Sequence, residues 1–308
     1  MTDYFLLTYA DSQGRPRAGI RVGDSVLDLH EAGLGVDSTL AVLADWTAME
    51  PKLKALADEI GGNSGASARL APAVRKLSAV KLLAPILYPG GIFCAASNYT
   101  DHMREMSGRE PPDKSKVRPY FFPKTTVHSV IAGGDAIRLP SISKQVDWEI
   151  EIGVVIGKPC RAVTESQAMD YVAGYTIMND LSLRDQGART DWNFRVDWFA
   201  HKCFDTSAPM GPWITPKSQI KDIYDVNLKL WVNDELMQNA SSKYMHFNIA
   251  EQISYLSERL TLRPGDVIST GTPSGVGRPR GIFLKPGDTV TMEVEGIGKM
   301  TNPVVQGE

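Results

Sequence analysis

The sequence DWEIEIGVVIG at residues 147–157 places two carboxylates inside an apolar run that is typical of a buried β-strand. Side chains two positions apart in a strand project from the same face, so Glu149 and Glu151 are expected to lie side by side. Two such carboxylates repel each other and lose hydration on burial, so the pair requires a compensating positive charge. A divalent metal ion meets this requirement. A strand with a solvated acidic face is the alternative for the spacing alone.

Asp180 is the candidate for a third ligand, because it follows the apolar segment 175–178 where the sequence turns polar. Three carboxylates without clustered His or Cys form a hard oxygen site. Such a site suits Mg²⁺ or Mn²⁺, with Ca²⁺ as a possible substitute.

Composition restricts the class of protein. The chain has 308 residues, of which 43% are hydrophobic, and this length allows one large domain, or a large domain with a small appendage. A net charge of −3 provides no basic field, so nucleic acid is not an expected partner. No apolar segment is long enough for a membrane span, and the N-terminal residues lack a basic signal region. Three cysteines without C-x-x-C spacing favour a reducing, cytoplasmic location.

The pattern of elements predicts an α+β, β-rich protein, because short apolar runs alternate with Gly and Pro from about residue 85 onward. The Gly-rich segment 61–68 is the candidate boundary between a small N-terminal α+β domain, residues 1–75, and a catalytic domain, residues 76–308. The clearest helix is 248–260, with Asn248 as N-cap. Residues 104–118 carry many charges and two prolines, which predicts a mobile, exposed loop that suits a lid or a surface insertion equally.

His102 and Glu105 form a candidate general-base pair. They are three positions apart, so on one helical turn they share a face, and the carboxylate would orient the imidazole to accept a proton from water. The alternative is an exposed helix end that carries both residues by chance.

Three further side chains are candidates for substrate contact. Lys202 lies in an aromatic setting, where a buried ammonium needs an anionic partner; a surface lysine is the alternative. Arg184 would bind a substrate carboxylate, or else pair with Asp185. Thr272 lies in the turn GTPSGVG, which offers N–H groups and a hydroxyl to an anion.

Five motifs in order resemble the fumarylacetoacetate hydrolase family over about residues 80 to 305. They are S-N-Y-x-x-H-x-x-E at 97–105, D-W-E-x-E-x-G-V-V-I-G at 147–157, N-D-x-S-x-R-D at 179–185, K-x-F-D-T-x-x-P-x-G-P at 202–212 and G-T-P-x-G-V-G at 271–277. Residues 1 to about 75 resemble the small N-terminal domain of longer bacterial members named as homoprotocatechuate-pathway isomerases or decarboxylases.

The resemblance implies a mixed β-roll fold, a homodimer and a role for each candidate residue. Glu149, Glu151 and Asp180 are implied to bind Mg²⁺ or Mn²⁺, and His102 and Glu105 to activate water. Lys202 is implied to be the cation opposite the reacting carbonyl, and Lys124 and Thr272 to contact the substrate. Two positions depart from the family pattern. Asn98 stands where some members have an Asp, and Gly187 stands where R-D-x-Q members have Gln, with Gln186 one position early.

The resemblance and the residues together favour hydrolysis of the C3–C4 bond of a 2,4-dioxo acid (an acylpyruvate), which yields pyruvate and a carboxylic acid. The alternatives use the same enolate chemistry in the same site: a decarboxylase, a hydratase or an isomerase of a 2-oxo acid. A catalytically silent keto-acid binding protein is a third possibility. The sequence leaves the acyl group open.

Overall fold

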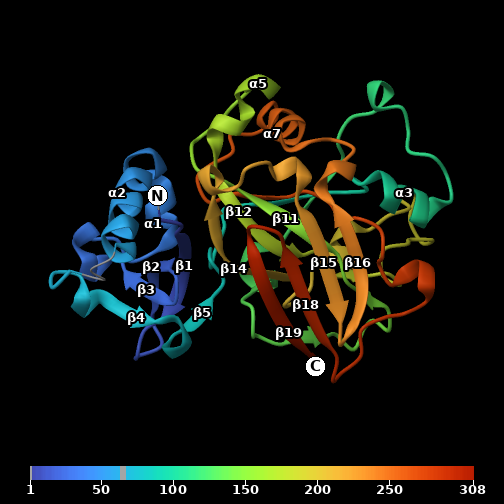
Figure 1. Ribbon diagram of the computed structural model, residues 1–308. Coiled ribbons are helices and arrows are strands. Elements are labelled where there is room, and N and C mark those ends of the chain that lie inside the picture. Colours follow the sequence, from blue (N-terminus) through green and yellow to red (C-terminus); the bar gives the residue numbers. More distant parts are fainter. Residues whose placement is uncertain (1, 63–66) are drawn as a thin grey trace.

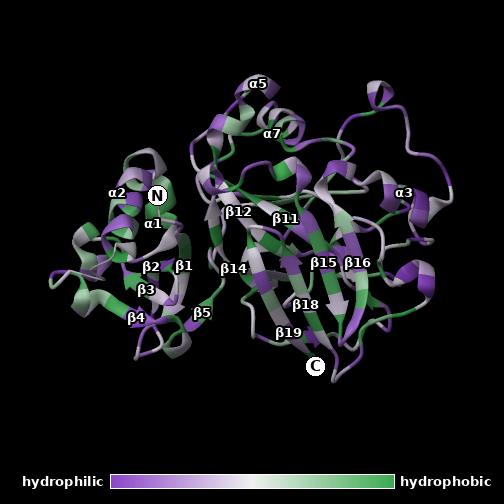
Figure 2. Cartoon of the chain, viewed as in Figure 1, coloured by the Kyte–Doolittle hydropathy of each residue, from purple (hydrophilic) through white to green (hydrophobic). Residues whose placement is uncertain are grey.

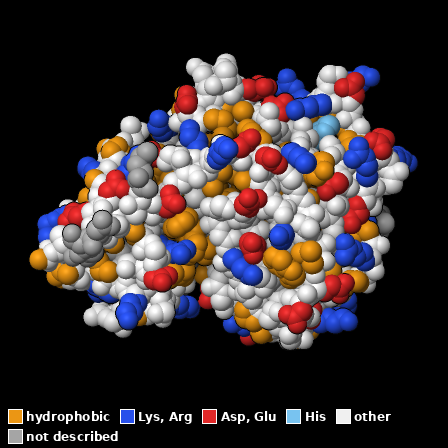
Figure 3. Space-filling model, viewed as in Figure 1, with side chains coloured by type: hydrophobic (Ala, Val, Ile, Leu, Met, Phe, Trp, Pro, Cys, Tyr) orange, Lys and Arg blue, Asp and Glu red, His pale blue; other side chains and the backbone are white. Residues whose placement is uncertain are grey.

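The computed structural model describes residues 2–62 and 67–308, so the central part of the expected boundary segment, residues 63–66, lies outside the described residues. Most strands belong to two sheets, and Figure 1 shows a smaller N-terminal part beside a larger body. Charged side chains of both signs are interspersed over the face in Figure 3, in keeping with the small net charge. Within the described residues, no helix combines the length and the apolar character that a membrane span requires.

The larger sheet has twelve strands and runs through both parts of the molecule. Its main path is β4-β3-β2-β1-β14-β12-β11-β17-β6-β7, while β5 pairs with β1 and β8 pairs with β14. The bounds are β1 Phe5–Ala10, β2 Pro16–Val22, β3 Ser25–Asp28, β4 Val74–Lys76, β5 Lys81–Leu83, β6 Ile92–Ala95, β7 Phe121–Lys124, β8 Val130–Ile131, β11 Ile150–Ile156, β12 Val172–Asn179, β14 Ala208–Pro216 and β17 Val267–Ser269.

The second sheet has five strands in the order β16-β15-β18-β19-β9. The bounds are β9 Ile137–Leu139, β15 Asn227–Val232, β16 Glu235–Ser241, β18 Thr289–Val294 and β19 Gly298–Gln306. Asn233, with φ 55°, forms the tip of the β15–β16 hairpin, as the sequence predicts. A separate two-stranded sheet is formed by β10 (Val146–Asp147), which precedes β11 in the chain, and β13 (Ser182–Leu183).

Apart from α2, which has 16 residues, the α-helices of the described residues are short. Their bounds are α1 Thr39–Ala44, α2 Trp46–Gly61, α3 Thr100–Ser107, α4 Thr126–Ser129, α5 Glu165–Ala168, α6 Trp198–Lys202 and α7 Ile249–Ser257. The predicted helix at 248–260 is confirmed as α7. Asn248 and Glu251 form a capping box at its N-terminus.

The expected loop at 104–118 is helical over its first four residues, which form the last turn of α3, and Gly108 ends that helix in the left-handed conformation. Residues 108–118 are largely exposed, as predicted. Lys114 bonds Glu251 at 2.6 Å and so ties this segment to α7. Movement of the segment as a lid stays a prediction.

The N-terminal strands share a hydrophobic core with the larger body. Strand β1 pairs with β14 through Leu6 and Ile214, and Trp46 of α2 belongs to the same buried cluster as Met178 of β12. The second core lies between the two sheets, where hydrophobic residues line the strands in Figure 2. The division into domains at residues 75 and 76 stays a prediction.

Candidate metal centre and active site

The antiparallel pairing of β11 with β12 brings the first two acidic residues of the site next to the third. Glu151 pairs with Met178 in the ladder, and the amide of Asp180 donates to the carbonyl of Glu149 at 2.9 Å. Glu149 precedes the first residue of β11, whereas the sequence predicts it as the start of the strand. Because the start of β11 faces the end of β12, carboxylates about 30 positions apart in the chain converge.

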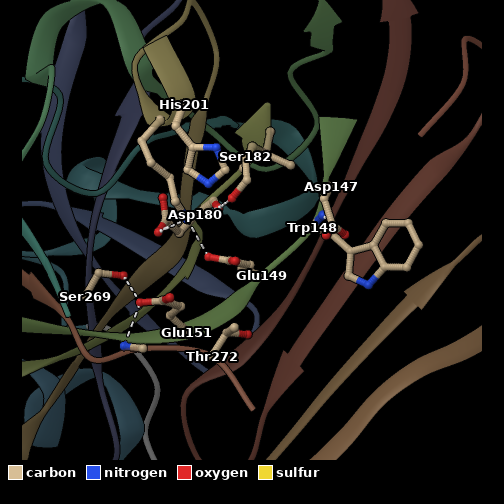
Figure 4. A network of polar contacts seen from close by, with 12 residues as sticks. Asp147, Trp148, Glu149, Glu151, Asp180, Ser182, His201, Ser269 and Thr272 are labelled. Atoms are coloured by element: carbon tan, nitrogen blue, oxygen red, sulfur yellow. Dashed lines mark hydrogen bonds and ion pairs between the residues drawn. The ribbon is translucent and has the colours of Figure 1, made fainter. Parts of the chain in front are cut away.

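The three predicted metal ligands meet in the interior. One carboxylate oxygen from each of Glu149, Glu151 and Asp180 lies within 4.8 Å of those from the other two, and all three residues are buried (Figure 4). This is the arrangement that the spacing and the strand pattern predict. Carboxylate oxygens at such separations suit a hard divalent cation.

Two buried lysines neutralise part of this charge. Lys202 Nζ lies 2.6 Å from Glu149 Oε2 and 2.7 Å from Asp180 Oδ2, so it is not a surface lysine. Lys124 Nζ donates to Asp180 Oδ1 at 2.7 Å and to the carbonyls of Leu181 and Lys202. These three acceptors match the three N–H donors of its ammonium. Contact of Lys124 with a substrate therefore stays a prediction.

Arg184 is buried against two acids. Its Nε donates to Asp147 Oδ2 at 2.7 Å and its Nη2 to Glu149 Oε1 at 2.6 Å. The proposed pairing with Asp185 is wrong, because that carboxylate turns away from the site and accepts from Ser143 Oγ at 2.6 Å. Arg184 still lines the cavity, so its contact with a substrate carboxylate stays a prediction.

Glu151 has no cationic partner among the described residues. Its Oε2 accepts from Ser269 Oγ at 2.6 Å and from the Gly271 amide at 2.8 Å (Figure 4). Burial, followed by repulsion from Asp180 and Glu149, raises the pKa of the Glu151 carboxyl well above its usual range. Burial also acts to raise the pKa of Glu149, but Lys202 and Arg184 outweigh it and hold that pKa below its usual range.

The donor set therefore fits a divalent cation. Within the described residues, four buried carboxylates, those of the triad and Asp147, face three buried cations, and the acid without a cationic partner belongs to the triad. Glu149, Glu151 and Asp180 would hold the ion. Asn98 does not join them, because its amide donates to the carbonyls of Phe247 and Thr270.

His102 and Glu105 share one face of α3 beside this cluster. His102 Nδ1 lies 3.7 Å from Glu105 Oε2, and no described residue gives this nitrogen a hydrogen bond. The Glu105 carboxylate accepts from the Gly275 amide at 2.9 Å. Burial would raise the pKa of Glu105, but His102 and the Gly275 amide together hold it below the usual range. The pair has the proximity that the sequence predicts, and its role as a general base stays a prediction.

A cavity of about 360 Å³, a size typical of small-molecule sites, lies beside the carboxylate cluster and His102. The predicted residues that line it are Glu149, Glu151, Asp180, His102, Lys202, Arg184 and Thr272. Thr272 is held in place, since its hydroxyl donates to the Ile150 carbonyl at 2.8 Å and accepts from Gln238. Lys124 and Glu105 do not line the cavity.

The polar residues of this wall that sequence reasoning missed include His201, Arg195 and Arg278. His201 lies on α6, one position before Lys202, and that adjacency is the only sequence signal that could have identified it. Arg195 lies outside helices and strands and Arg278 begins a short 3-10 helix, and no periodicity of the sequence predicts either position. Gly187 also lines the cavity, whereas Gln186 donates to the Ile142 carbonyl and is not part of the wall.

A profile described as the C-terminal domain of fumarylacetoacetate (FAA) hydrolase matches residues 91–305, more than two thirds of the chain. The chain belongs to the fumarylacetoacetate hydrolase family. Two similar relatives are mitochondrial oxaloacetate tautomerases. The Xenopus laevis protein is 40% identical over 233 residues, which cover 74% of this chain and 69% of the relative. The Rattus norvegicus protein is 35% identical over 298 residues, which cover 94% and 88%.

Solved structures of family members share the fold. Maleylpyruvate hydrolase from Sphingobium sp. SYK-6, in complex with manganese(II) and pyruvate, aligns with a TM-score of 0.76 at 28% identity, covering 99% of this chain and all of that one. A putative HpcE protein from Mycobacterium smegmatis aligns with a TM-score of 0.80 at 29% identity, covering 98% and 100%. The expected family, with its α+β, β-rich catalytic fold, is confirmed.

Proposed function

We propose that this protein is a Mg²⁺- or Mn²⁺-dependent hydrolase that cleaves the C3–C4 bond of a 2,4-dioxo acid to give pyruvate and a carboxylic acid. The observation that carries the proposal is that His102, with Glu105 behind it at 3.7 Å, lines the same cavity as the three-carboxylate cluster. A similar structure, that of maleylpyruvate hydrolase, is described with manganese(II) and pyruvate, which supports both the metal and the product.

Glu149, Glu151 and Asp180 would hold the cation through carboxylate oxygens. The chemistry that the cation would supply is that of a Lewis acid, which favours formation of an enolate from the substrate. The chain's own residues would supply a base for water, compensation for developing charge and a cavity that holds the substrate.

His102 would act as the base. The Glu105 carboxylate lies on the Nδ1 side of the ring and favours a proton there, which leaves Nε2 to take a proton from water. The resulting hydroxide adds to the 4-carbonyl, the C3–C4 bond breaks, and its electron pair forms the enolate of pyruvate. A proton then returns to C3. The Lys202 ammonium, on the same cavity wall, stabilises the negative charge as it moves.

Two exposed arginines at the cavity favour an acyl group that carries its own negative charge. Arg195 and Arg278 both line the cavity, and neither guanidinium has an acidic partner among the described residues. A free cation beside a cavity attracts an anionic ligand and can bind its carboxylate in a bidentate manner. The proposed substrate is therefore an acylpyruvate with a distal carboxylate.

Keto–enol isomerisation of an oxaloacetate-type acid is the second candidate. It is favoured by two oxaloacetate tautomerases among the similar relatives, one of which aligns with 94% of this chain. That reaction moves a proton between carbon and oxygen and consumes no water. The same cation site and the same cavity would serve it.

We propose that the protein acts as a homodimer. Trp192, Phe194 and Phe199 are 65%, 78% and 68% exposed within one short segment, which supports an interface there. Sedimentation equilibrium would test this, and a monomer at micromolar concentration would contradict it.

The decisive experiment follows the ultraviolet absorbance of acylpyruvate and oxaloacetate enols together with pyruvate release. Hydrolysis of an acylpyruvate removes its enol band and releases one pyruvate for each carboxylic acid, only with Mg²⁺ or Mn²⁺ present. Loss of the oxaloacetate enol band without pyruvate release would identify the isomerase instead. No change in either substrate would contradict both candidates.

A further inference from the structure

His201 is a polar residue of the cavity wall to which the proposed reaction assigns no task. Its Nδ1 lies 2.9 Å from the carbonyl oxygen of Leu183. A carbonyl oxygen only accepts hydrogen bonds, so Nδ1 carries the proton and donates it. The neutral ring therefore presents an unprotonated Nε2, which is a hydrogen-bond acceptor.

The surroundings fix the ring in this orientation. Trp198 contacts it edge to face, with the ring centroids 5.9 Å apart. A Cβ atom added to Gly187 would lie 2.7 Å from Nδ1, so the imidazole fills the space beside this glycine. Burial, with Lys202 and Arg184 nearby, lowers the pKa of His201 to about 4, which keeps the ring neutral.

The Nε2 atom is an acceptor without a donor. Among the described residues no hydrogen bond to Nε2 is formed, and the ring lines the cavity and points toward the carboxylate cluster (Figure 4). The buried cations of the wall, Lys202 and Arg184, already donate to Glu149. Arg195 and Arg278, which also line the cavity, form no hydrogen bond to Nε2 among the described residues. A donor group on a ligand in the cavity would therefore satisfy Nε2.

We propose that Nε2 of His201 accepts a hydrogen bond from a hydroxyl group of the bound 2-oxo acid, and so selects hydroxyl-bearing ligands. This inference rests on the proposed function for the class of ligand. The hydroxyl is that of an alcohol on the carbon chain or that of an enol. Both donate one hydrogen bond, and a site built to receive it discriminates against analogues that lack it.

Two variants separate the two nitrogens of the ring. In His201→Asn the side-chain amide keeps an N–H donor near Leu183 but has no atom at the position of Nε2. In His201→Gln the longer amide places an acceptor oxygen near that position. Mn²⁺ binding, measured by electron paramagnetic resonance, and thermal melting with Mn²⁺ establish that both variants are folded and loaded.

The first readout is calorimetric binding of pyruvate and 3-hydroxypyruvate to the Mn²⁺-loaded proteins, which requires no turnover. The wild type should bind 3-hydroxypyruvate about tenfold more tightly than pyruvate, the upper range for one hydrogen bond. His201→Asn should lose this preference and His201→Gln should keep most of it. If the wild type binds pyruvate but shows no preference, the inference fails while the proposed function stands. Binding of neither ligand would overturn both.

The second readout distinguishes the sources of the hydroxyl. Acetylpyruvate acquires a hydroxyl only by enolisation. A loss of about tenfold in kcat/KM for acetylpyruvate in His201→Asn, restored in His201→Gln, identifies an enol as the donor. An effect confined to 3-hydroxypyruvate binding identifies an alcohol. An effect on neither ligand overturns the inference.

Gly187→Ala provides an independent test in which His201 itself is not substituted. The added Cβ would displace the ring from Leu183, so this variant should lose the hydroxyl preference as His201→Asn does. Retention of the full preference in Gly187→Ala would contradict the fixed ring on which the inference depends.

Discussion

Neutralising Glu149 and neutralising Glu151 should change the stability of the metal-free protein in opposite directions. Glu149 is held ionised by two buried cations, Lys202 at 2.6 Å and Arg184 at 2.6 Å. Glu149→Gln leaves both cations without that partner. Glu151 has only the neutral donors of Ser269 and Gly271, which an amide oxygen satisfies equally well. Glu151→Gln therefore removes a repulsive charge without removing a hydrogen bond.

The magnitudes follow from these contacts. Removing one partner of a buried ion pair costs about 3–5 kcal/mol, and this is the expected loss in the free energy of unfolding for Glu149→Gln. Each unit by which burial raises a carboxyl pKa corresponds to about 1.4 kcal/mol at a pH where the group must ionise. The pKa of Glu151 is raised well above its usual range, so Glu151→Gln should increase the free energy of unfolding near pH 7.

The assay is urea denaturation in EDTA at pH 7 and again with Mn²⁺. The cation should stabilise the wild type, by about 2.7 kcal/mol at one hundred times its dissociation constant. It should stabilise both variants much less, because each lacks one ligand. A loss of stability in metal-free Glu151→Gln similar to that of Glu149→Gln would refute the charge assignment. Full stabilisation of either variant by Mn²⁺ would refute the ligand set.

Three further predictions concern the base, the substrate and pH. His102→Ala should lower kcat by a factor of about 10² to 10⁴ with Mn²⁺ affinity unchanged. Hydrolysis by that variant at the wild-type rate would exclude His102 as the general base. The double variant Arg195→Met and Arg278→Met should raise KM about tenfold or more for an acylpyruvate with a distal carboxylate, and leave KM for acetylpyruvate unchanged; equal effects on both substrates would contradict distal recognition. Burial acts to raise the pKa of Asp28, but hydrogen bonds from Arg17 and from backbone and side-chain neighbours outweigh burial and lower that pKa. The ionised Asp28 carboxylate therefore stabilises the fold above about pH 4, and this stabilisation is lost as pH falls through the lowered pKa. Asp28→Asn should therefore be less stable than the wild type at pH 7, and the difference in urea midpoint should shrink as pH falls below about 4; a difference independent of pH would contradict this.

Sequence patterns predicted the parts of the site that are set by strand geometry. The alternation in 147–157 predicted a shared location for Glu149 and Glu151, and the polar end of the next apolar strand predicted Asp180. Both predictions depend only on the two-residue period of a strand and on antiparallel pairing. Helix α7 was predicted for a similar reason, because its cap and its apolar period are local.

The remainder depended on long-range packing. Arg184 and Asp185 are adjacent, and sequence alone did not indicate which of them faces the cluster; the pairing of β13 with β10 turns Arg184 inward. Likewise, no local pattern marked His201 as a residue of the cavity. Its position follows from α6 and from the space beside Gly187, which lies fourteen positions earlier in the chain.

The charge pattern explains why the cluster tolerates burial without being fully neutralised. Lys124, Lys202 and Arg184 form ion pairs with Asp180 and Glu149. Glu151 alone keeps an unbalanced charge. A fourth basic side chain at that point would stabilise the fold but would occupy the position of the dication. Under the proposed ligand set, Glu151 is the carboxylate whose stabilisation would depend on the ion, so metal binding and the free energy of folding would be coupled through Glu151.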